Sequence, residues 1–173
     1  MDNIKDDLQE HGFLYFLAFT PIIISFFFHL ILQIPVIGTV WLYAAPFTLL
    51  VYWAWVGSVY REKIKSPVRA ILVGNIFGVI LLLFYIWQFV LLPEGAQDLT
   101  FAYLSQLFSL PLEFATMWIG LLLEPDPEVT TIITSNAVQF IGFILMIISF
   151  AIGYFVKKRT EEKQSFCSFL YLK

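Results

Sequence analysis

The feature that most limits how this chain can fold is an uncharged stretch near its start. From His11 to Tyr60, fifty residues run without Asp, Glu, Lys or Arg. A soluble domain carries charges on about a quarter of its residues, so this stretch has no side suited to water. With 60% hydrophobic and only 13% charged residues over the whole chain, and roughly 20 apolar residues needed for each helical crossing of a bilayer, the sequence predicts an all-α integral membrane protein.

Four apolar segments are long enough to cross a bilayer. They cover residues 13–34, 40–60, 68–92 and 132–156. A fifth apolar segment, 101–123, has a similar length but contains the carboxylate of Glu113 and places Pro111 at its centre. Proline removes a backbone donor and clashes with the preceding turn of a helix, so length alone does not decide whether this segment crosses.

The positions of the basic residues favour four crossings. Lys and Arg concentrate in cytoplasmic loops, whereas Asp and Glu contribute little to orientation. The ten basic residues fall into three groups: Lys5; Arg61, Lys63, Lys65 and Arg69; and Lys157, Lys158, Arg159, Lys163 and Lys173. Four crossings place all three groups in the cytoplasm, whereas five would put one of the two large groups outside. We therefore expect a cytoplasmic segment 1–12, a four-helix transmembrane domain 13–156, and a cytoplasmic tail 157–173, in a bacterial plasma membrane.

On this topology residues 93–131 lie on the outer side. Segment 101–123 is then either an interfacial helix or a re-entrant pair of short helices hinged at Pro111. Backbone that interrupts a helix at membrane depth is tolerated only where protein or a water-filled cavity covers it. We expect the segment to pack against the bundle.

Two stripes of small residues indicate close helix packing. Gly74 and Gly78 form a GxxxG pattern, which lets two helix backbones approach in a membrane. Gly142 and Gly153 belong to a second stripe, on the last apolar segment, at alternating spacings of four and three residues. The partner of each stripe, either another helix of this chain or a neighbouring subunit, stays open at this point.

Polar side chains gather in the outer half of the predicted bundle. In the first segment Pro21, Ser25, His29 and Gln33 recur every four residues, and polar groups in lipid are costly, so this face is expected to point inward. An outward-facing polar pocket is therefore predicted, roofed by segment 101–123. Its candidate lining residues are His29, Gln33, Gln88, Gln106, Glu113, Asn136 and Gln139.

Several functional classes find no support in the sequence. The net charge of −3 and the absence of a basic stripe argue against a nucleic-acid partner. With Cys167 as the single cysteine and His11 and His29 as the only histidines, the sequence predicts neither a metal site nor a cofactor. It contains no catalytic motif, so we expect a protein that is not an enzyme.

Two functions remain. The first is a non-enzymatic membrane subunit that forms a homo-oligomer or joins a larger complex through its small-residue stripes. The alternative is transport or capture of a small solute or ion in the outer polar pocket. Four helices are few for a carrier acting alone, which favours the first function slightly.

Overall fold

The computed structural model describes residues 2–93, 96–123 and 132–171, and all of the regular structure in these ranges is helical. Two long helices, α1 (Asp2–Leu32) and α2 (Ile37–Lys63), come first. A bent segment follows, made of α3 (Pro67–Gly74), α4 (Ile76–Ile86) and the short π-helix η1 (Trp87–Leu91). Two short helices, α5 (Leu99–Gln106) and α6 (Leu110–Leu123), lead to the long α7 (Ile132–Tyr171). The four predicted apolar segments thus coincide with α1, α2, the bent segment and α7.

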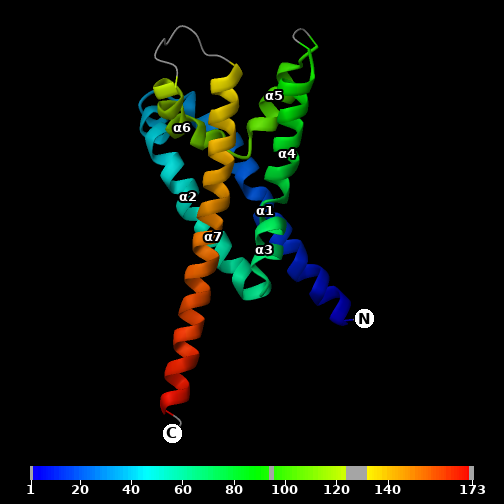
Figure 1. Cartoon of the computed structure of the whole chain (residues 1–173), viewed down its shortest axis with the longest axis vertical. Coiled ribbons are helices and arrows are strands. Elements are labelled where there is room, and N and C mark those ends of the chain that lie inside the picture. Colours follow the sequence, from blue (N-terminus) through cyan, green and yellow to red (C-terminus); the bar gives the residue numbers. More distant parts are fainter. Residues whose placement is uncertain (1, 94–95, 124–131, 172–173) are drawn as a thin grey trace.

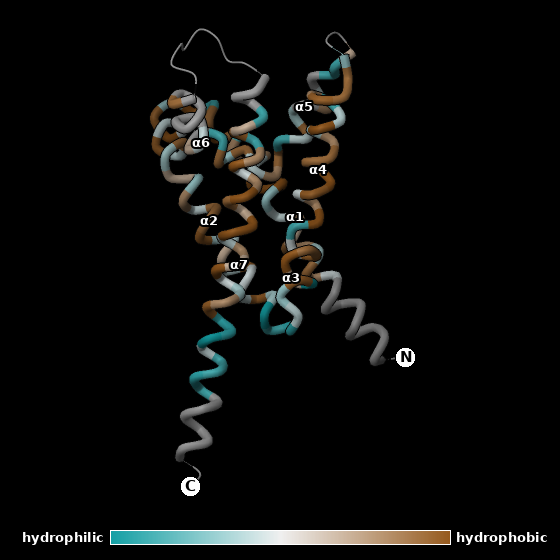
Figure 2. The backbone as a smooth tube through the Cα atoms, in the orientation of Figure 1, coloured by the Kyte–Doolittle hydropathy of each residue, from teal (hydrophilic) through white to brown (hydrophobic). Residues whose placement is uncertain are grey.

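Three helical stretches are long and apolar enough to cross a membrane: Gly12–Leu32, Ile37–Lys63 and Asn136–Gln164. The bent segment makes a fourth candidate if its two parts form one span. These lengths and compositions are consistent with an integral membrane protein. Figure 2 shows apolar residues concentrated in the bundle. Hydrophilic residues lie on the part of α7 that extends below it and on the α2–α3 turn, and also near the upper end of the bundle.

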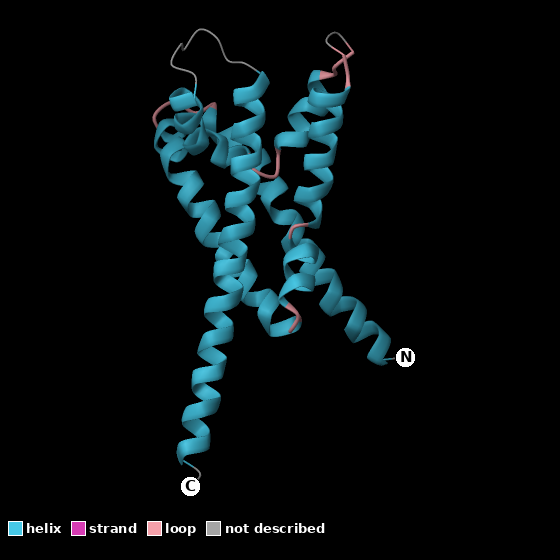
Figure 3. Ribbon diagram, in the orientation of Figure 1, coloured by secondary structure: helices cyan, strands magenta, loops and turns pink. Residues whose placement is uncertain are grey.

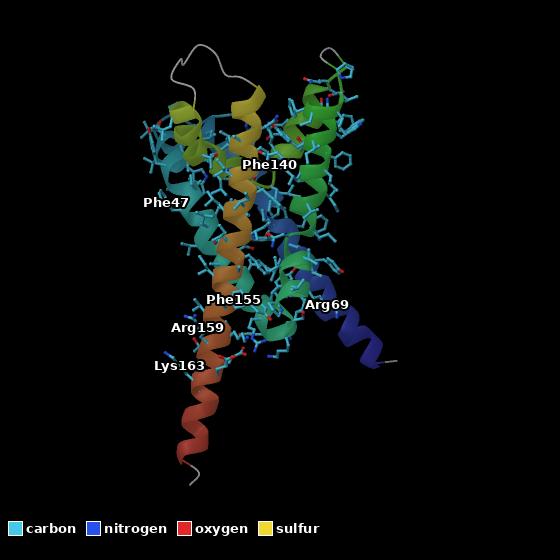
Figure 4. The ribbon with its side chains drawn as sticks, in the orientation of Figure 1. Phe47, Arg69, Phe140, Phe155, Arg159 and Lys163 are labelled. Atoms are coloured by element: carbon cyan, nitrogen blue, oxygen red, sulfur yellow. The ribbon has the colours of Figure 1, made fainter. Side chains whose placement is uncertain are left out.

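Both ends of the described chain lie at the same end of the bundle (Figure 1). Ion pairs join the two large basic groups there, because Arg61 lies 3.0 Å from Glu161 and Lys157 lies 2.7 Å from Glu62. In Figure 4, α7 passes from Phe140 near the top through Phe155 to Arg159 and Lys163 below the bundle. We call this lower end the basic end. Of the basic residues named above, Lys173 lies outside the described residues.

Specific residues set the turns between the long helices. In the α1–α2 turn, a Cβ at Gly38 would lie 2.7 Å from the Leu32 carbonyl oxygen, so only glycine allows the chain to reverse this tightly. Pro67 begins α3, where its missing N–H costs nothing. These turns pack α1 on α2, and α3 on both of them.

The bend between α3 and α4 is centred on Asn75 and measures 56°. The Asn75 side chain donates to the Ile71 carbonyl oxygen at 2.9 Å and accepts a hydrogen bond from the Trp53 indole at 3.2 Å. A side chain that enters the helical hydrogen-bond ladder is a recognised cause of sharp kinks. Sequence length alone predicted one continuous helix over 68–92, and the structure corrects that prediction.

The core is built mainly between α2 and α7, the most extensively packed pair of helices. The Trp53 ring on α2 packs at a tilt against Phe150 on α7, and the Tyr60 ring packs against Phe150 edge to face. The two backbones meet closely at Gly57 and Gly153, because a Cβ at Gly153 would overlap the backbone of Ala54. This pair is the frame on which the remaining helices pack.

The segment 101–123 forms a helical hairpin rather than a single helix. Its turn, Leu107–Ser109, lies deeper in the bundle than the start of α5 or the end of α6 (Figure 3). One arm, α5, packs on α4, and the other arm, α6, packs on α2 and α7. The predicted hinge at Pro111 needs correction, since Pro111 lies in the first turn of α6, where proline is tolerated. The chain reverses just before it.

Phe108 anchors the turn of this hairpin in the centre of the bundle. Its ring lies 5.6 Å from the Trp53 ring and 6.1 Å from the Phe143 ring. A Cβ at Gly78 would come within 2.6 Å of the Phe108 ring, so the absence of a side chain at Gly78 makes room for it. The depth at which α6 begins is therefore fixed by core packing.

Candidate functional site: a buried polar cluster between α6 and α7

Oxygen atoms without hydrogen-bond partners are buried where α6 packs on α7. They are Ser109 Oγ, Glu113 Oε1 and Gln139 Oε1. Ser109 and Gln139 are 1% and 4% exposed. A buried polar atom without a partner costs about 1–3 kcal/mol, so such atoms in a folded chain call for an explanation.

The antiparallel packing of α6 and α7 brings these three residues to neighbouring levels. A Cβ at Gly142 would lie 3.3 Å from the Ser109 Cβ, so these two positions are in contact. Glu113 lies one turn further along α6, and Gln139 lies about one turn back along α7, in the same direction. Glu113 and Gln139 are therefore expected at the same level, about 6 Å above the contact between Ser109 and Gly142.

A tyrosine from α4 completes the cluster on its other side. The Tyr85 hydroxyl donates a hydrogen bond of 2.9 Å to Asn136 Oδ1 on α7. Tyr85 also lies close enough to Glu113 for an electrostatic interaction between them. We call Tyr85, Ser109, Glu113, Asn136 and Gln139 the polar cluster.

Glu113 is the only carboxylate of the cluster, and two effects act on it. Burial disfavours the charged form and raises the pKa of the Glu113 carboxyl to about 7. Its position in the first turn of α6 favours the charged form, because backbone N–H groups give a helix N-terminus a partial positive charge. The carboxyl can therefore hold or release a proton near neutral pH.

Three of the seven predicted pocket residues belong to the polar cluster: Glu113, Asn136 and Gln139. Gln88 is buried at a different place, where its amide donates 3.2 Å to the Asp98 carbonyl oxygen just before α5. Gln106 is half-buried in the last turn of α5. Gln106 thus lies within the hairpin and Gln88 lies beside its start, and neither belongs to the polar cluster.

The first helix behaves differently from the expectation that its polar face points inward. Pro21 and Ser25 are buried, but His29 and Gln33 are exposed. The His29 ring packs edge-on against Tyr103 of α5 at 5.5 Å. The structure thus places His29 beside the hairpin, and nothing brings it to Glu113.

Sequence reasoning missed Tyr85 and Ser109. Tyr85 lies in an apolar run where an aromatic residue is ordinary, and only the structure reveals its partner. Ser109 had a usable signal, because it precedes Glu113 by four residues and so shares its face on one helix. That signal depends on knowing that a helix begins before Pro111.

The predicted packing glycines all lie against atoms of the same chain. A Cβ at Gly74 would come within 2.5 Å of the Phe150 ring, and the contacts of Gly78, Gly142 and Gly153 are those described above. Cys167, the single cysteine, lies in a part of α7 whose side chains are not described. Within the described ranges, no three His, Cys, Asp or Glu side chains gather as metal ligands would. Comparison with family models, curated proteins and solved structures finds no match to this chain.

Proposed function

We propose that this chain crosses the membrane four times, with both termini in the cytoplasm, and binds a small solute in the polar cluster from the outer side. The observation that carries the proposal is the set of buried, unpartnered oxygens beside the α5–α6 hairpin. Interrupted helices at membrane depth are typical of binding sites in transporters. The bound solute would supply the missing hydrogen-bond partners.

The same arrangement favours solute binding, the alternative function considered from the sequence, over self-association through the glycine stripes, which was the first. Each of the four glycines packs inside the chain, so these stripes offer no free face for a second subunit. Four crossings are still few for an alternating-access carrier. We therefore propose a capture or transport role that is exercised within a larger membrane assembly, through surfaces other than the glycine stripes.

The test is a cysteine-accessibility experiment in sealed vesicles of both orientations, with Cys167 replaced by Ser. Single cysteines replace Ser109 in the cluster and Ile148, an exposed residue of the apolar α7 surface. A small, water-soluble methanethiosulfonate reagent is expected to label Ser109→Cys, because a solute site must be reached by water. Ile148→Cys serves as the matched lipid-facing control and is expected to remain unlabelled.

Sidedness is read from three further single cysteines, at Ser66, Gln97 and Gln164. Gln97→Cys and Ser109→Cys should react from one side of the membrane, and Ser66→Cys and Gln164→Cys from the other. An unreactive Ser109→Cys in a folded protein whose Gln97→Cys is labelled would refute a solute site that opens to the outer side. Labelling of Ser109→Cys and Ser66→Cys from one side would refute the topology.

A further inference from the structure

The charge around the polar cluster is unbalanced. Between Ala70 and Val156 the sequence contains no Lys or Arg, so α4, α5, α6 and the membrane part of α7 bring no permanent positive charge to Glu113. The part of α1 and α2 from His11 to Tyr60 adds none, and His29 lies exposed against Tyr103. Glu113 is half-buried and its Oε1 atom is fully buried. A buried charge must be paired or protonated, and its own chain offers this carboxylate no cation.

The unpartnered atoms are suited to a positive ligand. Carboxylate and amide oxygens accept hydrogen bonds and coordinate hard cations, and a serine hydroxyl can turn its lone pairs toward a cation. Gln139 and Ser109 are each more than nine-tenths buried, with these oxygens unpartnered. One carboxylate oxygen of α6 and two neutral oxygens, from the turn before α6 and from α7, are thus buried without partners at neighbouring levels.

The size of that negative charge sets the charge of the ligand. Among the described side chains of α5 and α6, the other carboxylate nearby is Asp98, which is exposed and caps α5. One carboxylate neutralises one positive charge. A divalent ion would leave an excess charge in a medium where uncompensated charge is costly.

We propose that Ser109, Glu113 and Gln139 form a binding site for one monovalent cation, either an alkali metal ion or a protonated amine. This inference rests on the proposed function and specifies its solute class. Alkali ions and ammonium groups share the requirement for several oxygen ligands around one positive charge. Glu113 neutralises the charge, and the other two oxygens complete its coordination.

The experiment is isothermal titration calorimetry of the whole chain in lipid nanodiscs at about pH 8, where the Glu113 carboxyl is mainly ionised. The probes are NaCl, KCl and methylammonium chloride, with N-methylglucamine chloride keeping the ionic strength constant. We expect one of the three small cations to bind with a 1:1 stoichiometry. Binding of Na⁺ or K⁺ identifies an ion site, and binding of methylammonium identifies an amine site.

Three variants establish where the cation binds. Glu113→Gln keeps the shape of the side chain and is expected to weaken binding at least about 30-fold, because a buried charge loses its partner. Gln139→Met removes one neutral oxygen at similar volume and is expected to weaken binding by about tenfold. Asp98→Asn is the matched control, because it neutralises an exposed carboxylate of the same hairpin and should bind as the wild type does.

Several results would overturn the inference: no binding of any monovalent probe to the folded wild type, equal binding by Glu113→Gln, or tighter binding of Mg²⁺ than of every monovalent probe. These results are separate from the accessibility test. A labelled Ser109→Cys without cation binding would leave the solute site in place and reject its cationic ligand. Cation binding with an unlabelled Ser109→Cys would keep the cation site and reject access from the outer side.

Discussion

The close approach of α2 and α7 predicts the effect of adding one methyl group at Gly153. An ideal Cβ there would overlap the Ala54 carbonyl oxygen and would lie 2.5 Å from its carbonyl carbon. An ordinary contact between carbon atoms is about 3.5–4.0 Å. The two helices would have to separate by about 1.5 Å to accommodate Gly153→Ala.

The cost of that separation follows from what surrounds it. The obstacle is backbone, so no side chain can rotate away. Opening the α2–α7 interface also loosens Trp53, Val56 and Phe150, which are fully buried at the same level. Overpacking usually costs about 1–3 kcal/mol, and we expect Gly153→Ala to lower the free energy of unfolding by an amount at the upper end, about 3 kcal/mol.

A second glycine on the facing helix sharpens this prediction. A Cβ at Gly57 would meet the backbone of Phe150, with its carbonyl carbon at 2.9 Å. One movement of the helices relieves both clashes, so the double variant Gly57→Ala/Gly153→Ala should cost less than the sum of the single variants. Contacting residues typically show such non-additivity, of about 0.5–3 kcal/mol.

Reversible unfolding in mixed detergent micelles, followed by circular dichroism, measures these free energies. Gly12→Ala is the matched control, because no atom lies within 4 Å of its Cβ, and Ala is a better helix former than Gly by about 1 kcal/mol. A free energy of unfolding of Gly153→Ala within about 0.5 kcal/mol of the wild-type value would contradict the close approach of α2 and α7. So would a loss of unfolding free energy in the double variant equal to the sum of the losses in the two single variants.

Three further predictions concern single side chains. Tyr60→Phe removes the 2.6 Å hydrogen bond to the Leu14 carbonyl and should lower the unfolding free energy by about 1 kcal/mol, whereas the exposed control Tyr43→Phe should leave it unchanged in the same unfolding assay. Asp98→Ala removes the N-cap of α5 at a cost of about 1 kcal/mol, and hydrogen exchange should show faster opening of α5 but not of α7. The raised pKa of Glu113, about 7, means that the native state binds its proton more tightly than the unfolded state does, so stability is highest at low pH and falls as the pH rises toward 7. In a buffer containing only N-methylglucamine as the cation, Glu113→Gln should therefore become more stable relative to the wild type over this range, and parallel pH profiles for the two proteins would contradict the assignment.

The positions of the long helices could be predicted from the sequence because they depend on length and charge. Apolar runs of more than 20 residues and the grouped basic residues predict α1, α2, the bent segment and α7 to within a few residues at most ends. The bend at Asn75 could not be predicted in this way. It depends on a hydrogen bond from Trp53, 22 residues away in the chain, and an apolar run carries no sign of that partner.

The sequence predicted which polar residues share one face of a helix only where those residues are one or two turns apart. Residues four apart on an α-helix advance by about 400°, so each step drifts by about 40°. Pro21 and Ser25 share a buried face, but Gln33 lies three steps from Pro21 and has rotated by about 120°. This drift accounts for the exposure of His29 and Gln33. Ser109 and Glu113 are only one step apart, so they lie close to the same face.

Core packing determines where the polar cluster lies in the bundle. Phe108 fits against Gly78 and between Trp53 and Phe143, and this contact fixes the depth at which the chain reverses. Since α6 begins two residues later, Glu113 comes one turn above the aromatic core, beside α7 and near Tyr85. A single long helix over residues 101–123 would have no reversal at Phe108 and no N-terminus beside α7, so its first turn could not carry Glu113 to that place. The reversal of the chain at residues 107–109 and the position of the Glu113 carboxylate therefore both follow from the packing of Phe108 in the aromatic core.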